Sequence, residues 1–75
     1  MTRAAQKRAE VAQLVLAEPA IDRLVGLLEL LGYTLAPLRL PKTLRAGPVR
    51  VHLVFRRIAS AGVATLRYHQ VVSLS

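Results

Sequence analysis

The spacing of apolar residues changes near residue 32 and divides the chain into a helical part and a strand-forming part. Over residues 2–17, Val11, Leu14 and Val15 fall on one helical face and charged side chains occupy much of the rest, which predicts a short amphipathic helix. Glu18-Pro19 marks the end of this helix, because proline lacks an amide hydrogen and suits the first turn of a new helix.

A second helix is predicted from Pro19 to Leu31, closed by Gly32, and it is apolar around most of its circumference. Its narrow polar strip consists of Asp22, Arg23, Gly26 and Glu29. A heptad-like series of apolar residues continues across Pro19 and consists of Leu14, Ala17, Ile21, Leu24, Leu28 and Leu31. This series favours a kinked helix or a helical hairpin along a dimer seam, with packing of both sides inside one monomer as the alternative.

Beyond Gly32 the apolar residues alternate with a period of two, which is typical of β-strands. Tyr33 to Leu40 predicts a strand, and Pro37 assigns that strand to a sheet edge because proline cannot donate to a β-ladder. The following segment, Pro41–Pro48, is basic and rich in turn-forming residues, so we expect it to be a flexible loop.

Residues 49–74 predict a β-hairpin, because the odd positions are apolar in 49–58 and the even positions are apolar after Val63. A tight turn at Ser60-Ala61 brings both apolar sets onto one face when the numbers of paired residues sum to 121. The pairs on the apolar face are then Val49 with Val72, Leu53 with Tyr68 and Phe55 with Leu66. Those on the other face are Arg50 with Val71, His52 with His69, Val54 with Arg67 and Arg56 with Thr65.

These elements predict an α+β fold in which two N-terminal helices pack on a three-stranded antiparallel meander sheet. We expect a single domain over residues 1–75, with a helical part at 2–32 and a basic β part at 33–75. Phe55 and Tyr68 should point to the core, while Arg57 alone breaks the alternation, so a bulge or strand end is expected there. The opposite sheet face carries Arg50, His52, Arg56, Arg67 and His69.

The composition is typical of a small folded domain that has no cross-links. The chain has 75 residues, 53% of them hydrophobic, and no cysteine, so neither a disulfide nor a thiolate metal site stabilises it. A homo-oligomer formed through the helices is therefore expected. Glu10 and Gln13 interrupt the only candidate signal sequence, and no window approaches 18 apolar residues, so we expect a cytoplasmic protein without a membrane partner.

The residue types needed for most enzyme chemistry are absent or badly placed. All four acidic residues lie on the predicted helices, where helix-end electrostatics and solvation explain them. No serine triad, phosphate-cradling glycine motif or thiol nucleophile is present. His52 and His69 lack a third ligand for a metal and have arginine neighbours that repel a cation. We therefore expect a protein that is not an enzyme and uses no cofactor.

Two short segments bear on a possible ribonuclease. Leu31-Gly32-Tyr33 and the histidine-bearing run from Val51 to Phe55 are similar to small basic toxin ribonucleases of the HicA type, in which a helix ending in glycine and an aromatic residue precedes such a strand. The similarity spans about half the chain, and the family's Gly-Ser before the histidine and its C-terminal helix are missing, so we do not assign the chain to that family. The resemblance implies RNA cleavage by His52 or His69, since imidazoles among cationic groups can cleave RNA without a carboxylate.

Positive charge is the strongest functional signal. The net charge is +7, and residues 30–75 contain seven basic and no acidic side chains, which attracts polyanions. We expect phosphate contacts with DNA or structured RNA, since arginine suits bidentate phosphate binding and aromatic side chains for base stacking are scarce. The candidate residues are Arg39, Lys42, Arg45, Arg50, His52, Arg56, Arg67 and His69.

Three other interpretations of the same residues stay open. A small regulator or inhibitor would dock the basic face on an acidic protein. A ribonuclease toxin would use His52 or His69. Alternatively, the arginines solvate an exposed sheet and reflect genomic base composition alone.

Overall fold

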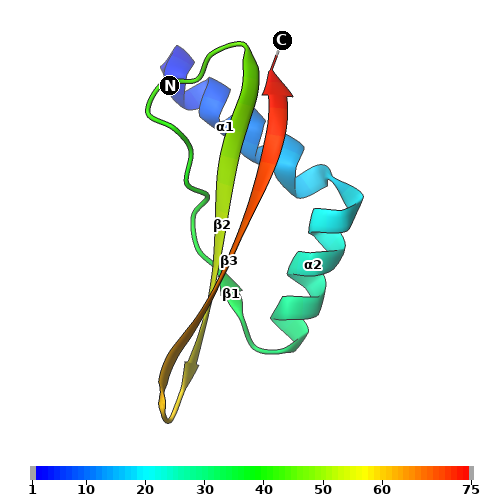
Figure 1. Ribbon diagram of the computed structural model, residues 1–75, viewed down its shortest axis with the longest axis vertical. Helices are drawn as coiled ribbons and strands as arrows, with labels where there is room; N and C mark the ends of the chain where they lie inside the picture. The colour runs from blue at the N-terminus through cyan, green and yellow to red at the C-terminus, as the bar shows by residue number, and fades with distance from the viewer. Residues whose placement is uncertain (1, 75) are drawn as a thin grey trace.

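A computed structural model describes residues 2–74 and has two helices followed by three strands (Figure 1). The helices are α1 (Arg3–Ala17) and α2 (Pro19–Leu30). The strands β1 (Thr34–Leu35), β2 (Gly47–Ala59) and β3 (Gly62–Leu74) form an open antiparallel sheet in the order β1-β2-β3. The predicted α+β fold with N-terminal helices is confirmed.

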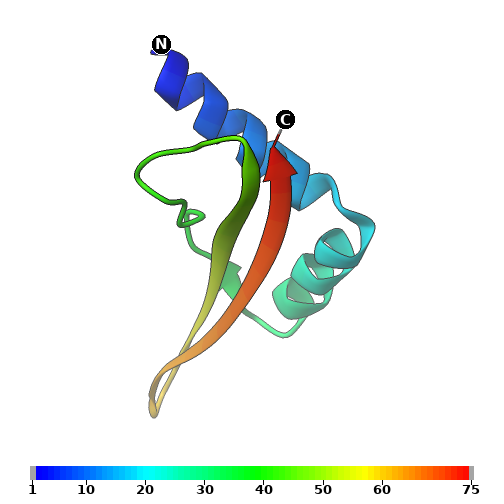
Figure 2. The same cartoon turned by 45° about the horizontal axis from the view of Figure 1, so that its top comes forward.

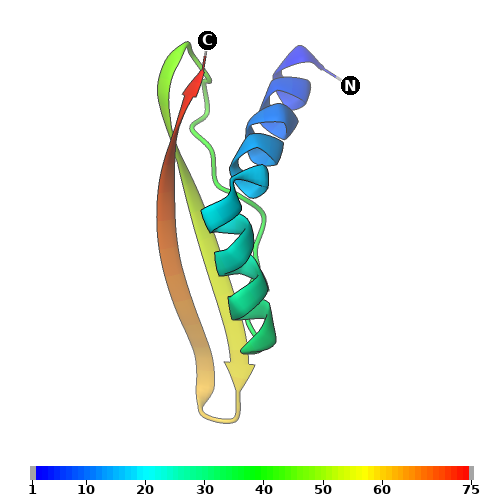
Figure 3. The same ribbon diagram turned by 90° about the vertical axis from the view of Figure 1, so that its right-hand side faces the viewer.

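The two helices meet at a sharp bend and do not form an antiparallel hairpin (Figures 1 and 3). A single extended residue, Glu18, separates them, and Pro19 occupies the first position of α2. The Thr2 hydroxyl accepts a hydrogen bond from the Ala5 amide at 3.1 Å, and the Glu18 carboxylate accepts one from the Ile21 amide at 3.0 Å. Both are N-caps that satisfy otherwise unpaired amides at the helix starts.

The C-terminus of α2 turns the chain toward the sheet at Gly32, which has a φ of +91°. The Gly32 amide donates to the Glu29 carbonyl at 3.0 Å and the Tyr33 amide donates to the Leu28 carbonyl at 2.9 Å. This pair of bonds is a Schellman motif, which ends a helix with a left-handed residue that is usually glycine.

The predicted register of the β2–β3 hairpin is confirmed over its whole length. Every pair from Gly47 with Leu74 to Ala59 with Gly62 has residue numbers that sum to 121. His52 lies opposite His69, Leu53 opposite Tyr68 and Phe55 opposite Leu66. The expected interruption at Arg57 is wrong, because this residue pairs with Ala64 in an unbroken ladder.

Arg57 keeps its place in the strand because its side chain lies against the end of α2. A Cβ atom added to Gly32 would be 3.6 Å from the Arg57 Nε, so the arginine stem lies beside the turn that closes the helix. A cation is favourable near the negative end of a helix dipole. Arg57 therefore points to the helical side of the sheet, away from the other strand arginines.

The first strand is shorter than predicted. Thr34 pairs with Arg56 and Leu35 with Phe55, whereas a separate bridge joins Arg39 to His52. The partner numbers sum to 90 in the first two pairs and to 91 in the bridge, so one extra residue lies between them on the β1 side. The interruption falls at Pro37, which has no amide hydrogen to donate. The loop that follows ends at Ala46, because Gly47-Pro48 already belongs to β2.

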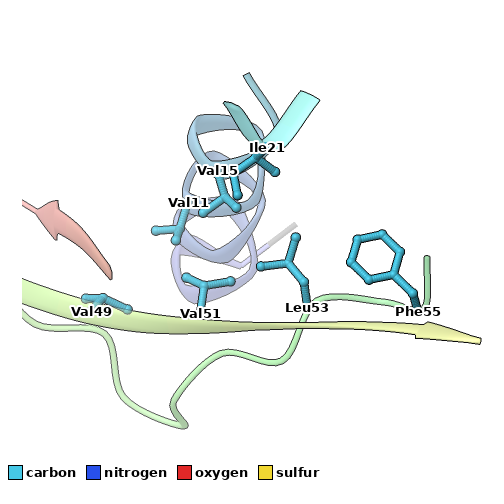
Figure 4. Close-up of a cluster of buried hydrophobic side chains, with 7 residues drawn as sticks. All are labelled: Val11, Val15, Ile21, Val49, Val51, Leu53 and Phe55. Atoms are coloured by element: carbon cyan, nitrogen blue, oxygen red, sulfur yellow. The ribbon is translucent and has the colours of Figure 1, made fainter. Parts of the chain in front are cut away.

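The core lies between the helices and the middle strand (Figure 4). Its buried residues come from α1, α2 and the odd positions of β2 and are Val11, Val15, Ile21, Val49, Val51, Leu53 and Phe55. Side chains alternate between the two faces of a strand, so the even positions of β2 point away from the helices. This places the basic residues of the hairpin on the uncovered face, which we name the outer face.

The helices cover β2 more fully than β3. Leu66 and Tyr68 lie on the helical side of the sheet, yet they are 42% and 43% exposed. Tyr68 thus points to the helical side of the sheet as expected, but it is not part of the buried core, because no helix covers that part of β3. Only Val72 and Leu74, at the end of β3, pack against the core.

The closed end of the hairpin extends beyond the helices (Figures 1 and 2). Ile58 is 87% exposed and Val63 is also exposed, so this end packs against no other element. Within residues 2–74, neither helix has the length and apolar character needed to cross a membrane.

Candidate nucleic-acid interface

Basic side chains of two neighbouring strands, β2 and β3, lie on the outer face. Arg50, His52 and Arg56 come from the even positions of β2, and Arg67 and His69 come from β3. All five are exposed. Residues two apart on one face of a strand are separated by about 6.8 Å, so Arg50 and Arg56 are about 20 Å apart along β2.

Arg39 joins this face through its bridge to β2. The Arg39 amide donates to the His52 carbonyl and the His52 amide donates to the Arg39 carbonyl, both at 3.0 Å. Because of the extra residue near Pro37, Arg39 shares the face of His52, while Leu38 and Leu40 pack against the core on the other side. Arg39, His52 and His69 therefore form a row across the sheet.

The two histidines are direct cross-strand neighbours. Their ring centroids are 5.7 Å apart and the ring planes are inclined by 51°. His52 uses its backbone groups on Arg39, so the His52–His69 pair is not hydrogen-bonded, and such pairs hold their side chains closest together. The pairing was predicted from the hairpin register alone.

A hollow on the outer face surrounds Val54 and is lined by Arg39, His52, Leu53 and Arg67 as well. Val54 is only 6% exposed although it points away from the helices. Arg39 and Arg67 line the same hollow and are exposed, and the aliphatic stem of an arginine covers apolar surface while its charged head stays in water. Two arginines are thereby positioned on either side of one hydrophobic residue.

Lys42 and Arg45 lie in the loop before β2, and both are exposed. Lys42 does not join the outer face but lines a second hollow together with Arg3, Lys7 and Arg8 of α1. The Arg8 Nη1 donates to the Pro41 carbonyl at 2.7 Å, which ties the helix to this loop. Lys42 therefore belongs to a second basic surface, whereas Arg45 lines neither of the two hollows.

The second cluster contains residues that the sequence prediction missed. Arg3 is in the first turn of α1, where cations are unfavourable beside the positive end of the helix dipole, and no acidic residue is present in that turn. Arg3 and Lys7 are also four residues apart, a spacing at which like charges repel. Arg3 and Lys7 occupy positions where a positive charge lowers the stability of the helix. This unfavourable placement is the feature of the sequence that could have identified the second cluster.

The described residues offer little to a metal ion. Across residues 2–74 no group of three or more histidine, cysteine or acidic side chains could hold one. All four carboxylates lie on α1, on α2 or at the junction between them, and none is on a strand. The outer face is suited to binding an anion.

Comparisons with known proteins found no matching family model, no matching curated protein and no matching solved structure. They therefore give no support to the similarity with HicA-type ribonucleases.

Proposed function

We propose that this protein is a non-enzymatic nucleic-acid-associated protein that contacts the phosphate backbone of DNA or structured RNA through its outer face. The observation that carries the proposal is the grouping of four exposed arginines, Arg39, Arg50, Arg56 and Arg67, around the His52–His69 pair on a face without carboxylates. Guanidinium groups bind phosphate oxygens in bidentate geometry.

The arrangement favours contact with the backbone over contact with bases. Of the three aromatic residues other than histidine, Phe55 is buried, Tyr33 packs against the core, and Tyr68 is on the helical side of the sheet. The outer face therefore offers no phenylalanine or tyrosine on which unpaired bases could stack. Phosphate contacts position a protein on a duplex without reading its sequence, so binding with little sequence preference is expected.

The length of the face is also suited to a duplex. Arg50 and Arg56 span about 20 Å, which corresponds to the rise of roughly six base pairs along the axis of B-DNA. Lys42 and the α1 residues Arg3, Lys7 and Arg8 offer a second anion-binding group beyond the edge of the sheet. A bound backbone could run from the outer face to this cluster.

The direct test is the salt dependence of binding to a duplex DNA and to a duplex RNA. If each of the four outer-face arginines neutralises one phosphate of the DNA, the log–log slope of affinity against salt is about −3.6. A flat response or no binding would contradict the proposal, and would instead fit an acidic protein as the partner of this face.

A second candidate, an RNA-cleaving protein, is favoured by the 5.7 Å separation of the two imidazoles beside Arg39 and Arg67. Imidazole groups can act as general acid and base while arginines hold the phosphate. Incubation of RNA with the wild-type protein and with a His52→Ala, His69→Ala double variant tests it. Cleavage that only the wild type shows would establish this activity, and equal background cleavage would eliminate it.

A further inference from the structure

The outer edge of β3 is unpaired. Within residues 2–74, β3 is the last strand of the sheet and has β2 as its only neighbour. Even residues of β2 hydrogen-bond toward β1, as His52 does with Arg39 and Val54 with Ala36, so the odd residues of β2 bond to even residues of β3. The odd residues of β3 therefore direct their backbone amides and carbonyls to the open edge, and these are Val63, Thr65, Arg67, His69, Val71 and Ser73.

This edge lacks the usual protection against strand pairing. It is 13 residues long and contains neither proline nor lysine, and the ladder with β2 shows no bulge. Prolines, lysines and bulges commonly protect the edge strands of natural proteins against such pairing. Arg67 is the only arginine of β3, whereas β2 carries three, so the β3 edge is the part of the hairpin that repels a basic partner least.

Exposed apolar side chains flank the edge on both sides of the sheet. Leu66 and Tyr68 lie on the helical side, and Val63 and Val71 lie on the outer side. A strand that paired with β3 would bring its own side chains against these residues. The unpaired backbone groups and the exposed apolar side chains of β3 would thus both be covered by a further strand at this edge.

We infer that β3 pairs antiparallel with β3 of a second copy of this chain, which makes one continuous six-stranded sheet. A two-fold axis normal to the sheet keeps the helical faces of both copies on the same side, so paired residue numbers must have an even sum. Pairing Tyr68 with the second copy's Tyr68 overlaps all of β3 and sets Arg67 opposite the second copy's His69. No arginine then faces an arginine.

The contact would be long for a pair of strands. All 13 residues of β3 would pair with the second copy, whereas strands in globular proteins usually have about 3–10 residues. The core has seven buried residues and the chain has no disulfide, so a second copy would add burial where the monomer has little.

The helical seam expected from the sequence is a weaker candidate. Ile21 of that seam is fully buried within the monomer, and Leu24 and Leu28 pack against the same core. Only Leu14, Ala17 and Leu31 remain exposed, at the two ends of the series. The centre of the seam is therefore not free for a partner.

Single-cysteine variants test the pairing, because the natural chain has no cysteine. Residues directly opposite in a non-hydrogen-bonded antiparallel pair have Cα atoms about 4.5 Å apart, within the range of a disulfide. On mild oxidation of the full chain without nucleic acid, Tyr68→Cys should give most of its protein as a covalent dimer. Leu31→Cys, which is more exposed and lies at the helical seam, should give several-fold less.

Sedimentation provides the second readout. The wild-type mass should rise from 8.2 kDa toward twice that value with concentration. Val71→Pro removes an outward amide without touching the β2 ladder and should keep the circular dichroism spectrum but abolish the rise, while Val71→Thr should retain it. A monomer at every concentration, an undiminished dimer in Val71→Pro, or cross-linking of Leu31→Cys equal to or above that of Tyr68→Cys would overturn the inference. Phosphate binding by single copies would be unaffected by that failure.

Discussion

Two glycines of the helical part differ in whether their position requires glycine. Gly26 lies inside α2, where a Cβ would meet no atom within 4 Å, so nothing in the packing requires glycine. Gly32 has a φ of +91° and closes α2 through the bonds to Glu29 and Leu28, so its backbone conformation requires glycine. The cost of an added methyl group is therefore decided by the backbone angle and not by space.

The alanine substitutions should shift stability in opposite directions. Gly26→Ala should raise the free energy of unfolding by about 0.5–1 kcal/mol, because alanine has the higher helix propensity. Gly32→Ala should lower it by about 1–2 kcal/mol, because alanine is strained in the left-handed region. Urea unfolding with an unchanged m-value measures both, and Gly32→Asn should lose less than Gly32→Ala. Equal shifts for the two alanine variants would contradict this role of Gly32.

At the scale of elements, the hairpin is the longest feature of the fold and is supported unevenly. Between Val49 and Phe55 it forms one wall of the core, whereas from Ile58 to Val63 it extends past the helices with both faces in water (Figure 2). Local stability follows buried apolar contact, so the two ends of one ladder should differ in their opening free energy.

Amide hydrogen exchange should report this gradient. Val51, Leu53 and Ala59 all belong to the odd set of β2 that bonds to β3, so their hydrogen bonds are of one kind. Val51 and Leu53 should exchange at least about tenfold more slowly than Ala59, because the first two are buried under the helices whereas Ala59 is exposed at the closed end of the hairpin. Uniform protection along β2 would mean that the closed end of the hairpin is supported by contacts absent from this fold.

The alternation of apolar and polar residues predicted the hairpin and its register, but not which hairpin residues the helices bury. The face of the sheet on which Phe55, Leu66 and the two histidines lie follows from the local alternation. A turn at Ser60-Ala61 then sets every pair along the ladder. Which residues a helix shields depends on where the two helices lie across the sheet, and the pattern around Tyr68 holds no information on that. Likewise, the position of Arg39 follows from a shift of apolar parity between Leu35 and Leu38, which the predicted continuous strand did not include.

At the scale of the whole molecule, charge is separated by element. The four acidic residues lie on the helices or at their junction, while the strands and the preceding loop carry seven basic residues and no acidic one. The sequence predicted this separation, and the outer face followed from strand parity. It did not predict the cluster of Arg3, Lys7 and Arg8 with Lys42, because that contact depends on how the loop folds back onto α1.

We propose that the outer face, and not the net charge alone, binds phosphate. Arg67→Gln and Arg23→Gln each remove one exposed arginine, the first from the outer face and the second from α2. The salt dependence of duplex DNA binding should be measured for both. Arg67→Gln should weaken binding and reduce the magnitude of the log–log slope by about 0.9, while Arg23→Gln should leave the slope at its wild-type value. Equal reductions in both variants, or none in Arg67→Gln, would contradict this proposal.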